Sequence, residues 1–80
     1  MPSLRRMSGR AVLAVFQSLG FEVQSQRGSH VKLRRVGPDG EQQTLTIPDH
    51  AELDTGTVRA IIRQAARYIA MDVLQRHFYR

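Results

Sequence analysis

The sequence contains no cysteine among its 80 residues. A disulfide framework and a cysteine zinc site are therefore excluded, and stability has to come from packing. No apolar run approaches the roughly 20 residues that span a bilayer, and no apolar segment follows the basic start of the chain. We expect a cytoplasmic protein without a secretory signal and with no membrane association. The chain also lacks a Walker A loop, a GxGxxG motif after a strand and a paired-carboxylate spacing.

Acidic residues are scarce as well. Seven Asp and Glu stand against twelve Lys and Arg, which gives a formal net charge of +5 and a pI near 11.1. This balance favours a phosphate backbone, an anionic membrane or an acidic protein as the partner, and charge alone does not choose among them. The apolar content of 41% is high enough for one small folded domain and too high for a disordered chain.

Hydrophobic periodicity predicts a single domain over residues 1–80 with an α+β fold. A basic N-terminal arm over residues 1–7 precedes a core of about residues 8–70. We expect a helix, three antiparallel strands and a second helix, with both helices on one face of the sheet. The expected elements are a helix over 9–19, strands over about 21–26, 30–36 and 41–47, and a helix that begins near residue 56.

Local signals set the expected boundaries. Ser8 is a good N-cap for the first helix, and Gly20 can end it in the left-handed conformation. The sequence Gly37-Pro38-Asp39-Gly40 is a strong hairpin turn. Asp54 or Thr55 is the expected N-cap of the last helix.

The apolar residues of these elements form the expected core. Phe21 and Val23 of the first strand and Leu45 and Ile47 of the third should face inward. One stripe of the last helix should pack on them: Val58, Ile61, Ile62, Ala65 and Ile69.

Beyond residue 70 the apolar pattern shifts to another face. Met71, Leu74 and Phe78 follow an i, i+3, i+7 spacing, while the earlier stripe would continue through polar positions. Two interpretations stay open for residues 71–80. They form either a helical extension whose second apolar stripe serves self-association or a protein partner, or a frayed tail.

The stretch from Arg27 to Arg35 carries the most informative chemistry. A Gly-containing turn opens into a strand whose alternation places His30, Lys32 and Arg34 on one face. An imidazole can give or take a proton near neutral pH, and nearby cations stabilise a phosphorane-like transition state. Arg27, Lys32 and Arg34 are the candidates to bind RNA phosphates, Gly28 allows close approach, and Ser29 can donate a hydrogen bond. A lone exposed histidine is also commonly only a surface residue.

Other polar residues have weaker claims. His50 follows the third strand and could lie near the same end of the sheet, whereas His77 lies in the tail. Arg59 and Arg63, with Arg67, fall on one flank of the last helix, which is either a solvated face or a phosphate or partner contact. Three scattered histidines without cysteine make a poor metal site, so we expect no metal and no cofactor.

Several short motifs together resemble the HicA toxin family over about residues 8–67. They are Gly20-Phe21, Arg27-Gly28-Ser29-His30, Pro38-Asp39-Gly40, Ile47-Pro48-Asp49-His50 and the run from Gly56 to Ala65. The resemblance implies a fold similar to a double-stranded-RNA-binding domain. It also implies a ribosome-independent mRNA interferase of a type II toxin–antitoxin pair, covered on its active face by a HicB-like antitoxin. The family's active histidine corresponds to His30, with Gly28 and Ser29 as its motif neighbours.

Three functional hypotheses follow. The first is a metal-independent mRNA endoribonuclease that inhibits translation, with His30 as the general acid or base. The second is a non-catalytic module that binds double-stranded RNA by shape and charge. The third is a protein-interaction domain whose basic surface docks an acidic partner.

Overall fold

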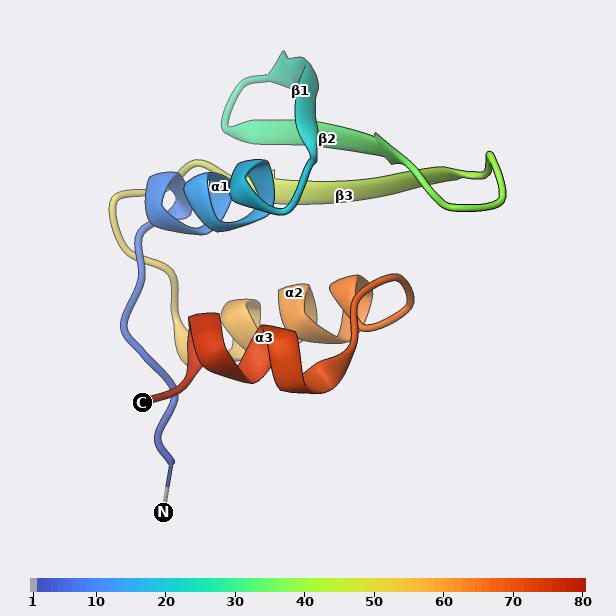
Figure 1. The fold of residues 1–80 in the computed structure, drawn as a ribbon. Coiled ribbons are helices and arrows are strands. Elements are labelled where there is room, and N and C mark those ends of the chain that lie inside the picture. The colour runs from blue at the N-terminus through green and yellow to red at the C-terminus, as the bar shows by residue number, and fades with distance from the viewer. Residues whose placement is uncertain (1) are drawn as a thin grey trace.

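The computed structural model describes residues 2–80 and contains six regular elements (Figure 1). They are α1 (Gly9–Ser18), β1 (Glu22–Arg27), β2 (His30–Val36), β3 (Gln42–Pro48), α2 (Thr55–Ala65) and α3 (Met71–Phe78). The predicted α+β order of helix, three antiparallel strands and helix is confirmed, and a third helix follows it. The similarity to a double-stranded-RNA-binding domain stays a prediction.

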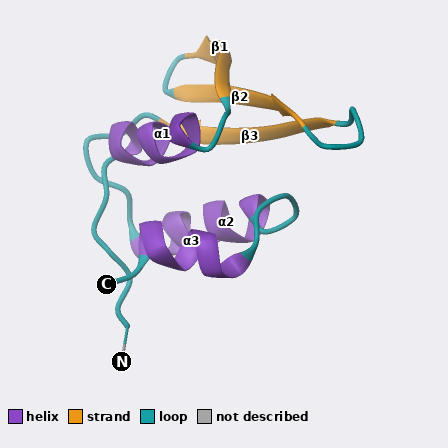
Figure 2. Ribbon diagram, in the orientation of Figure 1, coloured by secondary structure: helices purple, strands orange, loops and turns teal. Residues whose placement is uncertain are grey.

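The sheet has the strand order β1-β2-β3, with both pairings antiparallel. All three helices lie on one side of it, as Figure 2 shows. The alternation of β2 agrees with this arrangement, because Val31 and Leu33 are buried while His30, Lys32 and Arg34 are exposed. The other side of the sheet therefore presents polar side chains to solvent.

The helix boundaries follow from local capping. The Ser8 side chain accepts a hydrogen bond from the backbone N–H of Ala11 at 3.0 Å. Gly20 has a φ of 96° and ends the first helix, as predicted. Asp54 is the N-cap of α2, and its side chain accepts from the backbone N–H of Thr57 at 2.7 Å.

Phe16 lies at the centre of the core. Its ring contacts those of Phe21 and Phe78, with centroids 5.9 and 5.7 Å away. The stripe predicted for the last helix is buried throughout, although α2 ends at Ala65 and Ile69 follows it. Leu45 and Ile47 are also buried, as expected.

The prediction that Val23 faces the core is wrong. Val23 is 50% exposed although its cross-strand partner Leu33 is buried, because β1 is an edge strand of the sheet and the helices do not cover it. The helices α1 and α2 pack against β3, while β1 bends away from them (Figure 1). The pairing of β1 with β2 is irregular between Val23 and Ser25, and this bulge changes the face on which the residues after Val23 lie.

Of the two interpretations of residues 71–80, the frayed tail is wrong, because residues 71–78 form α3. The alternative, an outward stripe of Met71, Leu74 and Phe78, is wrong for two of its three residues. Leu74 and Phe78 are completely buried, and Met71 is 46% exposed. The chain turns back after α2 (Figure 1), so α3 lays this stripe on the core and not on a partner. Leu74 and Phe78 are therefore not available on the surface for self-association, and Met71 is the one residue of the three that stays exposed.

The N-terminal arm is tied to the end of α3. Leu4 forms an isolated antiparallel bridge with Tyr79, and the backbone N–H of Arg5 donates to the carbonyl of Phe78 at 2.8 Å. These bonds hold part of the predicted basic arm against the end of the chain. In the described part of the chain, no helix has both the length and the apolar character needed to cross a membrane.

Candidate active site

His30 is the first residue of β2 and lies directly after a tight turn. It pairs across the sheet with Arg27 of β1 and Pro48 of β3. Gly28, the first residue of the turn, has a φ of 55°, and glycine at this position is typical of a type II′ hairpin. A Cβ atom on Gly28 would meet nothing within 4 Å, so the backbone conformation alone requires glycine there.

Two cross-strand rows form a hollow of about 330 Å³ on the solvent face of the sheet. Cross-strand partners project from the same face. One row therefore places Arg27 beside His30, and the next places Ser25, Lys32 and Thr46 together. These five side chains line the hollow. With two cations and no carboxylate in the lining, the hollow favours an anionic ligand.

Of the residues predicted for the site, His30, Arg27 and Lys32 line this hollow and Arg34 does not. Arg34 is exposed on the same face but lines a separate depression with Glu22 and Val36. Ser25 and Thr46 line the hollow and were missed from the sequence. Their position depends on the strand register, and the bulge is what brings Ser25 opposite Lys32.

The loop after β3 closes onto the turn beside His30. The Nε2 atom of His50 lies 3.1 Å from the Oγ atom of Ser29, and the backbone N–H of Asp49 donates to the Ser29 carbonyl. The His50 carbonyl in turn accepts from the backbone N–H of Gly9 at 2.8 Å. The structure thus places His50 at the same end of the sheet as His30, held by contacts to the turn and to α1.

The remaining candidates lie elsewhere. Arg59 and Arg63 are exposed on α2 and line a hollow that does not include His30. His77 is half-buried on α3. The guanidinium of Arg35 donates to the Leu19 carbonyl at 2.8 Å and lies over the Phe21 ring, so its role is structural.

The carboxyl groups with shifted pKa values lie outside the hollow. The side-chain hydrogen bond from Gln43 lowers the pKa of Glu41, next to the far hairpin turn. The side-chain and backbone hydrogen bonds of Thr57 lower the pKa of Asp54 at the start of α2. Within residues 2–80, no three His, Asp or Glu side chains gather in a way that would hold a metal ion.

The hollow has the parts needed for chemistry at a phosphodiester. The imidazole of His30 can transfer a proton, and Arg27 and Lys32 can stabilise negative charge that develops on a phosphoryl group. All of these residues lie within the part of the chain that matches a known family. Residues 9–66 match the family described as "HicA toxin of bacterial toxin-antitoxin". Neither the search of curated proteins nor that of solved structures gives a match. Because the match spans more than half of the 80 residues, the chain belongs to the HicA toxin family.

Proposed function

We propose that the chain is a metal-independent mRNA endoribonuclease that acts in the cytoplasm as the toxin of a type II toxin–antitoxin pair. The observation that carries the proposal is the hollow shared by His30, Arg27 and Lys32. Membership of the HicA family supports a toxin that acts on RNA. An imidazole beside two cations and exposed to solvent is accessible to a polyanion as large as RNA.

In the proposed reaction the 2′-OH of a nucleotide attacks the adjacent phosphorus. The 2′-O–P bond forms, the P–O5′ bond breaks, and the products are a 2′,3′-cyclic phosphate and a 5′-OH end. His30 either takes the proton from the 2′-OH or gives a proton to the leaving 5′ oxygen. Arg27 and Lys32 stabilise the charge on the phosphorane-like transition state.

His50 is our candidate for the second proton transfer. Its contact with Ser29 places this second imidazole next to the turn that carries His30. Two imidazoles at one end of the sheet can divide the roles of acid and base. Ser29 would then orient the ring of His50, and a water molecule is the alternative second proton carrier.

We further propose that a HicB-like antitoxin covers the sheet face of His30, Lys32 and Arg34. All three side chains are exposed there, and a partner with acidic groups would neutralise this row and exclude RNA. Gly28 and Ser29 of the turn would allow RNA phosphates to approach the backbone closely.

The proposed route is tested by a matched set of substrates. A short RNA should be cut, and the same sequence with a 2′-deoxy or 2′-O-methyl sugar at the cleavage position should survive. The products should carry cyclic-phosphate ends, as mass spectrometry can show. Cleavage of the 2′-O-methyl substrate would contradict attack by the neighbouring hydroxyl. Binding of the RNA without any cleavage would favour the alternative, a non-catalytic RNA-binding module that uses the same basic face.

A further inference from the structure

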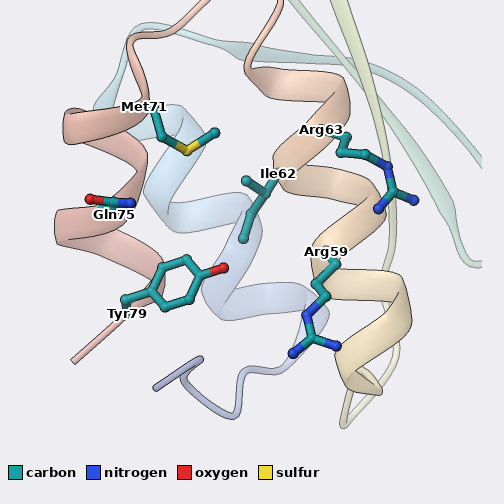
Figure 3. A pocket seen from close by; sticks show the side chains of 6 residues that line it. All are labelled: Arg59, Ile62, Arg63, Met71, Gln75 and Tyr79. Carbon is teal, nitrogen blue, oxygen red and sulfur yellow. The ribbon is translucent and has the colours of Figure 1, made fainter. Parts of the chain in front are cut away.

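A second hollow of about 330 Å³ lies between α2 and α3. Figure 3 shows its lining, which consists of Arg59, Ile62, Arg63, Met71, Gln75 and Tyr79. One wall belongs to α2 and the other to α3 and the residue after it. The HicA family match ends at residue 66, so α3 converts one flank of the matched domain into a groove that the matched part does not form alone.

The α2 wall carries two unneutralised positive charges. Arg59 and Arg63 are four residues apart, so both side chains lie on the same face of the helix one turn apart. Both are exposed. Among residues 2–80, the ion pairs join Arg6 to Glu52 and Arg76 to Asp72, and neither groove arginine takes part. The α2 wall of the groove therefore presents two guanidinium groups that can each pair with a carboxylate.

The interior of the groove is apolar. Ile62 points into the space between the two helices, and Met71 and Tyr79 extend toward it from the other wall (Figure 3). Met71 is 46% exposed, so about half of its side-chain surface has no partner within the fold. Methionine is flexible and polarisable, and it adapts to inserted apolar groups. An apolar side chain from another molecule would cover this exposed surface.

We propose that the groove binds an acidic amphipathic helix of a protein partner. In this arrangement one apolar side chain of the partner lies between Ile62 and Met71. Two carboxylates of the partner, one turn apart, pair with Arg59 and Arg63 as charge-assisted hydrogen bonds. This is the helix-in-groove mode of recognition, in which apolar anchors supply contact area and rim charges set orientation.

The chemistry of the groove favours a peptide over RNA or a second copy of the chain. A phosphate backbone would gain nothing from the apolar interior, and the basic face around His30 is lined by other residues. A second copy carries a net charge of +5, which opposes its approach to a positive rim. The inference does not depend on catalysis by His30.

The test uses a displayed library of random peptides, from which peptides are selected for binding to the 80-residue chain. The best binder is then labelled with fluorescein and its dissociation constant measured by anisotropy. We expect enriched peptides with an apolar residue and acidic residues one helical turn apart. Arg59→Gln and Arg63→Gln should each weaken binding about tenfold, as expected for loss of a charge-assisted hydrogen bond. Met71→Ala should weaken it roughly fivefold.

The matched control is Arg10→Gln, which removes one positive charge, as each groove variant does, at an exposed position outside the groove. This control should bind the peptide almost as well as the parent chain. No enrichment, or binders that ignore Arg59, Arg63 and Met71, would overturn the proposal. If Arg59→Gln, Arg63→Gln lost as much RNA affinity as Lys32→Gln, the groove would bind RNA, and the proposal would fail. A dimer in sedimentation that Met71→Ala abolishes would instead identify a second copy of the chain as the occupant, and this result would also overturn the proposal.

Discussion

The Nε2 atom of His50 lies 3.1 Å from the Oγ atom of Ser29, the residue that precedes His30. This contact joins the loop after β3 to the turn between β1 and β2. It brings a second imidazole to the end of the sheet where the first one lies.

The first prediction concerns this contact. His50→Gln keeps a side chain that can hydrogen-bond to Ser29 but cannot exchange a proton near neutral pH. If His50 transfers a proton, we expect RNA cleavage to fall about a hundredfold and one limb of the pH–rate profile to disappear. Ser29→Ala should slow cleavage less and keep both limbs. A His50→Gln variant with a full rate and an unchanged profile would limit His50 to a structural role.

The second prediction concerns the turn before His30. Gly28 and Gly40 both have positive φ values, 55° and 82°, and a Cβ atom at either position would meet nothing. Replacing either by Ala should lower the free energy of unfolding by about 1–3 kcal/mol, the cost of a positive φ for a residue with a Cβ atom. Urea unfolding measures this loss. Only Gly28→Ala should also weaken RNA cleavage, because Gly40 lies in the other hairpin turn. Equal cleavage by the two variants would show that the geometry of the first turn does not matter.

The third prediction concerns α3. Phe78 is completely buried against Phe16, so Phe78→Ala should lower the free energy of unfolding by about 3–5 kcal/mol and leave this small domain largely unfolded. Met71→Ala, at an exposed position on the same helix, should change it by less than about 0.5 kcal/mol. Circular dichroism during urea unfolding distinguishes the two. A Phe78→Ala variant as stable as Met71→Ala would mean that α3 does not pack on the core.

The fourth prediction concerns acid stability. Hydrogen bonds from Thr57 lower the pKa of Asp54 below its ordinary value of 3.8 in the folded chain. The unfolded chain therefore binds the proton more readily, and stability falls as the pH drops below that value and through the lowered pKa. Asp54→Asn keeps an N-cap acceptor without a titrating group, so its stability should depend less on pH in this range. Urea unfolding at neutral and acidic pH measures the free energy of unfolding of the parent chain and of Asp54→Asn. If this free energy depends on pH in the same way for both chains, Asp54 makes no contribution.

The sequence predicted most of the fold because local signals and periodicity agreed. Ser8, Gly20 and Asp54 each set a helix boundary by a local rule, and alternation along β2 separated its buried face from its exposed face. The failure at Val23 has a different origin. Val23 pairs with the buried Leu33, but β1 bends away from the helices, and this bend depends on tertiary packing that alternation along one strand does not show.

The reversal of the chain between α2 and α3 could not be predicted from the sequence for a similar reason. Residues 66–70 contain no glycine or proline, so no local signal marked the reversal of the chain. Without the reversal, the stripe of Leu74 and Phe78 looked unpartnered. The groove between α2 and α3 depends on the same reversal, so the sequence did not predict it either.

The candidate site was predictable only along one strand. Alternation placed His30, Lys32 and Arg34 on the same face, as the structure has them. It did not show that Arg34 lines a separate depression, or that Ser25 and Thr46 join Lys32. Those neighbours come from the register between strands, which a single sequence does not contain.

The most direct test of the proposed ribonuclease is RNA cleavage in EDTA by the full chain and by its His30→Ala variant. His77→Gln is the matched control, because it removes an imidazole that lies outside the hollow. Circular dichroism would first show that all three chains are folded. We predict cleavage by the parent and by His77→Gln, and a loss of about a hundredfold or more in His30→Ala. Equal cleavage by folded His30→Ala would contradict the role of His30, and intact RNA with the parent chain would contradict the nuclease itself.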